Sequence, residues 1–141
     1  MYKKILLAID GSEHSMRSTK EAVKIASLSQ GCVIEVVYVA DFSKAKSEVL
    51  HSQTKEELEM TRRKKFLPFE DLLNTNHISY NVVILHGDPG PAIIEHANKN
   101  EFDLVVIGSK GKGHSALQDV MLGSVSHKVV KRVNCPVLIV K

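Results

Sequence analysis

The chain has 141 residues, of which 43% are hydrophobic and 25% are charged, and its formal net charge is +3. A chain of this length falls within the usual size of one domain, so we expect a single domain over residues 1–141. The composition is ordinary for a soluble globular protein. Acidic and basic residues are interleaved along the sequence rather than gathered in one region, so we expect no nucleic-acid partner.

The first residues and the two cysteines bear on where the protein works. The opening apolar stretch has only five residues before Asp10, which is too short for a secretory signal and far too short to span a bilayer. Cys32 and Cys135 are isolated, and each opens a short apolar run. This pattern favours small buried thiols over metal ligands or a disulfide bridge. We therefore expect a cytoplasmic protein with no membrane segment.

Five short apolar runs recur along the chain, and all are rich in β-branched residues. Near-continuous apolar character of this kind is typical of strands buried on both faces, as in a parallel sheet. The predicted strands are Lys4–Ile9, Val33–Ala40, 79–85, 104–107 and 136–140.

Stretches with apolar residues at steps of three and four separate these strands and predict helices over 12–28, 88–98 and 120–133. A longer insert contains a charged helical segment, 54–65, which we interpret as a solvated surface helix. Pro68 is expected to end or kink that helix near Leu67. The alternation of strands and helices predicts a β-α-β series with right-handed crossovers.

The fourth apolar run is followed by a glycine-rich segment, 108–113, and a helix start is predicted at 123–126. Glycines let backbone amides approach an anion closely, and a helix start supplies unpaired N–H groups and the positive end of a dipole. Lys110 adds positive charge, while Ser124 and Ser126 offer hydroxyls that can cap the helix or bond a phosphate oxygen. These features predict a phosphate-binding loop; the alternative is a flexible glycine loop with a helix cap and no ligand.

Two familiar motifs nearly match this segment. The eight residues from Gly108 fit G-x-x-x-x-G-K-[ST], except that His114 stands where a lysine must hold the terminal phosphates. The residues from Gly111 to Ala116 imitate a dinucleotide fingerprint, but they lie late in the chain and lack the acidic residue expected about 20 positions on. The segment is therefore interpreted as neither a P-loop nor a dinucleotide-binding turn.

The first predicted strand ends in Asp10-Gly11-Ser12, the other polar strand end that carries a glycine. In open parallel sheets, ligands bind beyond the carboxyl ends of the strands where the strand order reverses. If the first and fourth strands are neighbours, Asp10 faces the Gly108 loop. It could then bond a ribose or base, or help place a phosphate-bound metal ion. The alternative is a turn residue that leads into a cap at Ser12.

Several stretches together resemble the universal stress protein family over nearly the whole chain. They are K-K-I-L-L-A-I-D-G-S from Lys3, G-D-P from Gly87, D-L-V-V-I-G-S-K-G from Asp103, L-G-S-V-S-H-K-V from Leu122 and C-P-V-L-I-V-K from Cys135. The resemblance implies a Rossmann-like α/β fold: a five-stranded parallel sheet of order 3-2-1-4-5 with helices on both faces. It also implies ATP with Mg²⁺ as the ligand, and homodimers formed through the last strand.

The site residues are carried over from the family motifs position by position. The implied phosphate contacts are Gly108, Gly111, Gly123, Ser124, Val125 and Ser126. The implied base and ribose contacts are Ala8, Ile9, Asp10, Val39 and Ile107. ATP-binding members have nine residues between the second glycine of G-x-x-G and the following G-[ST]. Here eleven residues separate Gly111 from Gly123. Counting from Gly113 instead restores nine, but it puts Lys110 at the first glycine position. Lys110 and Gly113 are therefore added to the expected nucleotide-binding residues.

No residue arrangement predicts strong catalysis. The sequence at Ser124 lacks the G-x-S-x-G elbow, and the seven histidines show no metal-ligand spacing. We expect His86 and His96 at ordinary surface or strand-end positions, no catalytic residue and no resident metal. Asp10 is the only carboxylate expected at the nucleotide, which suggests slow hydrolysis at most. We expect a nucleotide-responsive stress or signalling protein whose bound ATP shifts dimer or partner surfaces; the alternatives are a slow ATPase and a dimeric interaction module without nucleotide.

Overall fold

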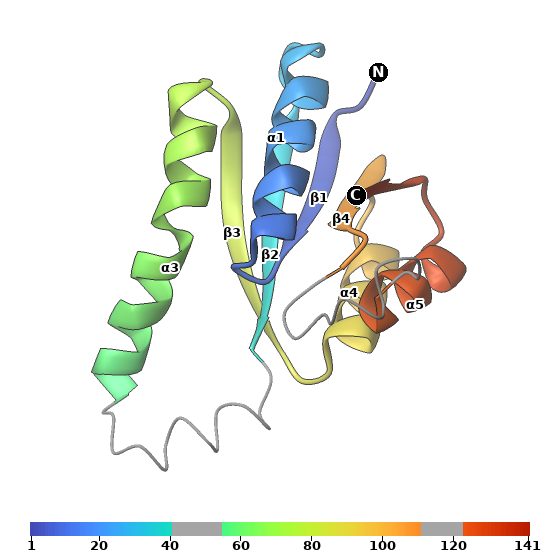
Figure 1. Cartoon of the computed structure of the whole chain (residues 1–141). Helices are drawn as coiled ribbons and strands as arrows, with labels where there is room; N and C mark the ends of the chain where they lie inside the picture. Colours follow the sequence, from blue (N-terminus) through green and yellow to red (C-terminus); the bar gives the residue numbers. More distant parts are fainter. Residues whose placement is uncertain (41–54, 111–122) are drawn as a thin grey trace.

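The computed structural model describes residues 1–40, 55–110 and 123–141, and a five-stranded sheet runs through them (Figure 1). Its strand order is β3-β2-β1-β4-β5, and every neighbouring pair is parallel. The predicted sheet and strand order are confirmed. The strands are β1 (Lys4–Ile9), β2 (Val33–Ala40), β3 (Ser79–His86), β4 (Leu104–Gly108) and β5 (Val137–Val140).

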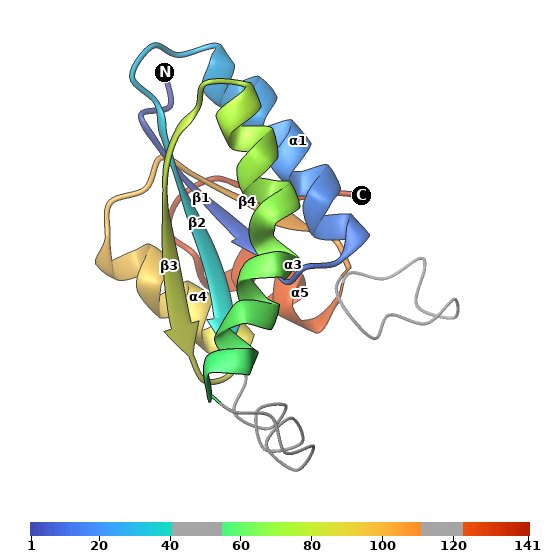
Figure 2. The same cartoon turned by 90° about the vertical axis from the view of Figure 1, so that its left-hand side faces the viewer.

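Helices cover both faces of the sheet, as predicted (Figures 1 and 2). Successive strand residues point to opposite faces, so Leu7 of β1 packs into one hydrophobic cluster while Leu6 packs into the other. The first cluster lies under α1 and α3, and the second lies under α4 and α5. The helices are α1 (Glu13–Ser27), α3 (Lys55–Thr75), α4 (Pro89–Lys99) and α5 (Ser124–Arg132). No helix in the described ranges is long and apolar enough to cross a membrane.

Two helix starts follow the local sequence closely. Ser12 is the N-cap of α1, with its hydroxyl oxygen accepting the Ser15 N–H at 3.3 Å. Asp88 is the N-cap of α4, and Pro89 is the first helical residue, where the missing proline N–H costs no intrahelical bond. The Asp88 side chain makes no capping hydrogen bond. Backbone preference, rather than a side-chain cap, therefore accounts for the start of α4.

Of the two effects expected from Pro68, an end or a kink of the insert helix, the end is wrong, because α3 continues through Pro68 to Thr75. Proline removes one intrahelical hydrogen bond. Pro68 is exposed, so water can reach the carbonyl that loses its partner. Phe66 and Phe69, on either side of it, are 8% and 3% exposed in the α1–α3 cluster. Burial of these two rings fixes the helix where propensity alone predicts a break.

The expectation that all five strands are buried on both faces is wrong for β3. This strand lies at one edge of the sheet, and its Val82 and Ile84 side chains are 42% and 47% exposed. The strand at the other edge, β5, has three half-buried residues of its four. An apolar run predicts a strand but does not say whether the strand is central, because edge position depends on topology.

Candidate functional site

The carboxyl ends of β1 and β4 meet at one edge of the sheet. Leu7 of β1 lies opposite Val106 of β4, so both strands end two residues later, at Ile9 and Gly108. The strand order reverses between β1 and β4, since β2 follows on one side of β1 and β4 lies on the other. This is the kind of position where open α/β sheets bind ligands. The adjacency predicted for the first and fourth strands is confirmed.

The first turns of α1 pack directly against Gly108. A Cβ atom built on Gly108 would lie 3.3 Å from the Ser18 hydroxyl oxygen and 3.4 Å from the His14 Cβ. It would also lie 3.2 Å from the Lys110 carbonyl oxygen. Gly108 therefore permits the close packing of helix and turn, because any side chain there would push its neighbours by a few tenths of an ångström. His14 and Ser18 are site neighbours that the motif did not indicate, because only the tertiary packing brings α1 against β4.

The backbone carbonyl of Ser109 ties the turn after β4 to the start of α5. It accepts the Gly123 N–H at 2.7 Å and the Ser126 hydroxyl at 3.0 Å. The Ser109 N–H in turn donates to the Val140 carbonyl of β5 at 2.8 Å. Two of the predicted phosphate donors, the Gly123 amide and the Ser126 hydroxyl, are therefore engaged within the protein.

The first turn of α5 offers the remaining donors. The N–H of His127 bonds the Gly123 carbonyl at 3.0 Å, and α5 has no side-chain cap. Within the described residues, the amides of Ser124, Val125 and Ser126 have no hydrogen-bond acceptor, as expected for a helix start. The Ser109 hydroxyl, 4% exposed, also lacks a partner there. This cluster of donors at the positive end of a helix dipole suits an anion.

Asp10 lies at the end of β1, half-buried, where its Oδ1 accepts the Ser12 N–H at 2.9 Å. The turn role considered for this residue is thus confirmed, and it helps to start α1. The next residue, Gly11, has φ 83°, a left-handed conformation that favours glycine.

A lysine that the motif did not indicate also reaches this turn. A Cβ atom on Gly11 would lie 2.8 Å from the Cε of Lys65, a residue of α3. The aliphatic stem of this lysine therefore covers the β1–α1 turn. The insert was interpreted from sequence as a solvated helix, and nothing in the local pattern indicates which turn its side chains approach.

The predicted apolar contacts divide between the two sides of the sheet. Ile9 belongs to the α1–α3 cluster, whereas Ala8, Val39 and Ile107 pack with the α4–α5 cluster. The predicted Lys110 is half-buried after β4. The predicted Gly111 and Gly113 lie outside the described residues. The described structure therefore brings together Asp10, Gly108 and the start of α5, with apolar side chains beneath them.

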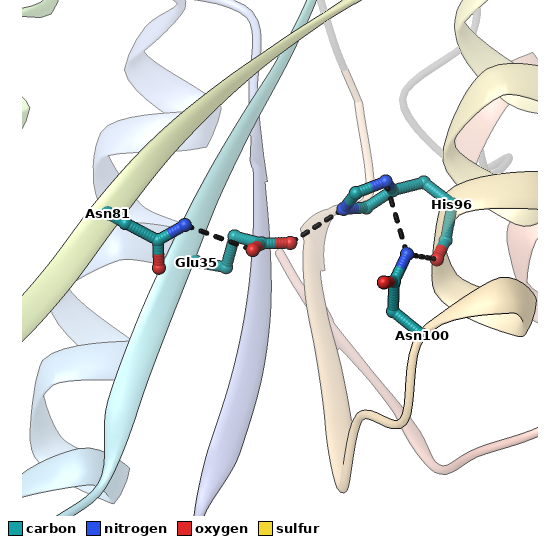
Figure 3. A network of polar contacts seen from close by, with 4 residues as sticks. All are labelled: Glu35, Asn81, His96 and Asn100. Atoms are coloured by element: carbon teal, nitrogen blue, oxygen red, sulfur yellow. Dashed lines mark hydrogen bonds and ion pairs between the residues drawn. The ribbon is translucent and has the colours of Figure 1, made fainter.

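A second polar group lies away from this edge, under α4 (Figure 3). Glu35 of β2 is 8% exposed and holds His96 of α4, with 2.6 Å between Glu35 Oε2 and His96 Nε2. Asn81 of β3 donates to the other carboxylate oxygen at 3.0 Å. The Asn100 side chain donates to the His96 carbonyl at 2.8 Å. The expectation of an ordinary surface or strand-end position for His96 is wrong, because β2 presents a buried carboxylate to α4.

The surroundings of Glu35 favour its charged form. Burial by itself raises the pKa of the Glu35 carboxyl, but hydrogen bonds from Asn81 and His96 and the charges of His96 and Lys4 act against it. The net result is a pKa below the ordinary value of 4.5. Glu35 lies level with Leu6, three residues before the end of β1. The group therefore joins α4 to the sheet and is not part of the edge site. Nowhere in the described ranges do three or more His, Cys, Asp or Glu residues gather as a metal site would require.

The fold and this edge define an α/β protein with a candidate anion site at the switch point of a parallel sheet. A sequence model of the universal stress protein family matches residues 1–141. Universal stress protein MJ0531 of Methanocaldococcus jannaschii is 32% identical, with 100% of this chain and 83% of that protein covered. Universal stress protein YxiE of Bacillus subtilis is 31% identical, with 100% of both covered. The chain belongs to the universal stress protein family.

Solved structures agree with this assignment. The structure of protein MJ0577, a universal stress protein of M. jannaschii, has a TM-score of 0.84 at 30% identity and covers 100% of this chain and 96% of that one. A universal stress protein in complex with cAMP has a TM-score of 0.69 at 23% identity, with 99% and 97% covered. One from Archaeoglobus fulgidus in complex with dAMP has a TM-score of 0.71 at 19% identity, with 99% and 98% covered. At 23% and 19% identity, the similarity of these last two structures to this chain shows a shared fold only.

Proposed function

We propose that this protein binds ATP with Mg²⁺ at the carboxyl ends of β1 and β4. Bound ATP then changes the surfaces through which the protein forms dimers or contacts partners. The phosphates lie against the start of α5 and the turn after β4. The ribose and base lie toward Asp10 and Val39. The observation that carries the proposal is the group of three amides, Ser124 to Ser126, without acceptors among the described residues, at the same sheet edge as Asp10.

The donor set favours a phosphate over other anions. Amides at a helix start bind phosphate without sequence-specific side chains, because the N–H groups and the dipole act together. The Ser124 hydroxyl is exposed beside them, and the buried Ser109 hydroxyl has no partner in the described part of the chain. Family members of the same fold are known in complex with cAMP and dAMP. Adenine nucleotides are therefore the ligand class to test first.

The metal ion would be held mainly by the nucleotide. Mg²⁺ usually keeps several waters and is bound by one or two carboxylates together with substrate phosphates. Asp10 is the carboxylate at this edge, although its Oδ1 already accepts the Ser12 N–H. One carboxylate without a second catalytic group supports binding or slow turnover rather than fast hydrolysis.

The test is mass spectrometry of small molecules released from the purified protein, followed by thermal melts with Mg-ATP, AMP and cyclic AMP. A ligand at a hundredfold excess over its dissociation constant stabilises the native state by about 2.7 kcal/mol, which is readily seen as a rise in melting temperature. We expect a rise with Mg-ATP. If nothing co-purifies and millimolar ATP leaves the melt unchanged, the nucleotide proposal is wrong.

One observation favours a second candidate function, a dimeric interaction module that binds no nucleotide. The Ser109 carbonyl already accepts hydrogen bonds from the Gly123 amide and the Ser126 hydroxyl, so the turn after β4 and the start of α5 are joined without a ligand. A melt that does not respond to any of the three nucleotides would support this candidate. Phosphate release that Asp10→Ala abolishes would instead support a slow ATPase.

We also propose a homodimer formed through β5. Among the strands that the structure describes, β5 is paired only with β4, so its outer backbone groups face away from the sheet. Its Val137, Leu138 and Ile139 side chains are half-buried. Ile139→Lys is expected to convert dimer to monomer in sedimentation velocity, because a charge at a closed apolar interface is costly. Val82→Lys on the opposite edge strand is the control and should sediment as wild type. Equal behaviour of the two variants would contradict an interface at β5.

A further inference from the structure

An apolar cavity of about 490 Å³ lies between α3 and the carboxyl halves of β1, β2 and β3. This volume falls within the range of about 300–1,000 Å³ that is typical of small-ligand sites. The sheet side contributes Ile9, Val36, Val82 and Ile84, and Tyr38 meets Phe66 of α3 with ring centroids 4.6 Å apart. The nucleotide site proposed above does not require this cavity.

Several apolar side chains that line the cavity are unusually exposed to solvent. Leu67 of α3 is 50% exposed, and Val82 and Ile84 of β3 are 42% and 47% exposed, although all three line the cavity. Met60 lies about two turns before Leu67 on the same face of α3 and is 60% exposed. Contiguous exposed apolar side chains around a hollow mark a binding surface more often than isolated ones do. An apolar group that filled this cavity would cover these exposed side chains.

Two charged side chains line the cavity, and they differ in their partners. Glu70 accepts the Tyr80 hydroxyl at 3.3 Å. Arg63 makes no ion pair or hydrogen bond to any residue in the described part of the chain. It belongs to the basic run Arg62-Arg63-Lys64-Lys65 of α3. An arginine beside an apolar hollow can form a forked, charge-assisted pair with a carboxylate.

We propose that this cavity binds an aliphatic carboxylate of medium or long chain, with its hydrocarbon tail among the apolar side chains and its carboxylate on Arg63. A nucleotide base fits less well, because its ring edge carries donors and acceptors, most of which a mainly apolar lining leaves unpaired. A hydrocarbon tail has no such groups. The charge of Arg63 distinguishes a carboxylate from a neutral lipid of equal length.

The test is isothermal titration calorimetry of the full chain with octanoate, decanoate and dodecanoate, each below its micelle-forming concentration. Affinity should rise about three- to fourfold per added methylene, the increment that burial of a CH₂ group gives. Arg63→Gln should weaken dodecanoate binding about tenfold and leave dodecanol binding unchanged. Arg17→Gln, an exposed arginine on α1, is the matched control and should bind both as wild type.

A second variant guards against a trivial effect on folding. Val82→Trp lies on an exposed edge strand, where a larger side chain is tolerated, and it should fill the cavity and remove binding of both dodecanoate and dodecanol. The proposal is overturned if wild type gives no heat with dodecanoate, or if Arg63→Gln weakens both ligands equally. It is also overturned if AMP or Mg-ATP displaces dodecanoate competitively, since the cavity would then be the base pocket. Dodecanoate binding that survives while all nucleotide responses fail supports this site and contradicts only the nucleotide proposal.

Discussion

Replacing Gly123 with valine is expected to abolish the rise in melting temperature that Mg-ATP gives to the wild-type protein. A Cβ atom at Gly123 would lie 3.2 Å from the Ser109 carbonyl oxygen and 3.5 Å from the Lys110 Cα. Valine adds two further carbons, so the turn after β4 must move away from the start of α5. The Gly123 N–H bond to Ser109, 2.7 Å long, holds these two segments together. Their separation carries the amides of α5 away from Asp10.

The size of the loss follows from linkage. At a hundredfold excess over the dissociation constant the bound ligand contributes about 2.7 kcal/mol, and all of this contribution should disappear. Valine is also a poor N-cap, so the ligand-free variant should lose about 1 kcal/mol of its own. The measurement is a pair of thermal melts, with and without Mg-ATP, for each protein.

Gly31→Val serves as the control. Gly31 has φ 80° in the turn between α1 and β2, so valine is strained there and lowers stability without touching the site. This variant should melt lower yet keep the full Mg-ATP response. If Gly123→Val also keeps it, the nucleotide does not bind at the start of α5.

Glu35→Gln is expected to destabilise the protein by about 1–3 kcal/mol at pH 7, the range for hydrogen bonds that involve a buried charged group. The substitution removes the charge that faces His96 at 2.6 Å and keeps nearly the same shape. Phe102 packs near His96, with 5.9 Å between ring centroids, and Lys4 lies 4.5 Å above that ring. Because these neighbours fix the imidazole, it has little freedom to find another partner.

The destabilisation should depend on pH in a defined direction. The folded-state pKa of Glu35 is lowered below 4.5, so the carboxylate stabilises the fold fully above its unfolded pKa. This stabilisation is lost as pH falls through the lower folded-state value. The difference in unfolding free energy between wild type and Glu35→Gln should therefore shrink as the pH falls below about 4. Urea unfolding at a series of pH values measures it.

Glu95→Gln is the matched control on the same helix. Glu95 pairs with Lys99 at 2.6 Å, the same separation as in the Glu35–His96 pair, but both side chains are more than 60% exposed. Solvent screens such a pair, so little change in stability is expected. A Glu35→Gln effect no larger than that of Glu95→Gln, or one that grows as pH falls, would contradict the role assigned to the buried carboxylate.

Local sequence predicted most of the helices and strands because their starts and types depend largely on residues close along the chain, whereas the strand order was implied by the family resemblance. The Ser12 cap, the Pro89 start of α4 and the β-branched runs all appear where short-range physics places them. Pro68 shows the limit of this reasoning. Its helix-breaking tendency is local, but burial of Phe66 and Phe69 against the sheet outweighs it.

The candidate site divides in the same way. The sequence by itself determined which residues are suited to an anion, namely the glycine turn at Gly108 and the start of α5, and it indicated Asp10 for the ribose, the base or a metal ion. Only the tertiary structure decided that the Ser109 carbonyl holds two of the expected donors, that Lys65 covers Gly11, and that Glu35 faces His96. Residue type and spacing specify chemistry and local conformation. Packing between segments far apart in the chain decides which of these groups meet, because burial and backbone hydrogen bonding are satisfied for the chain as a whole.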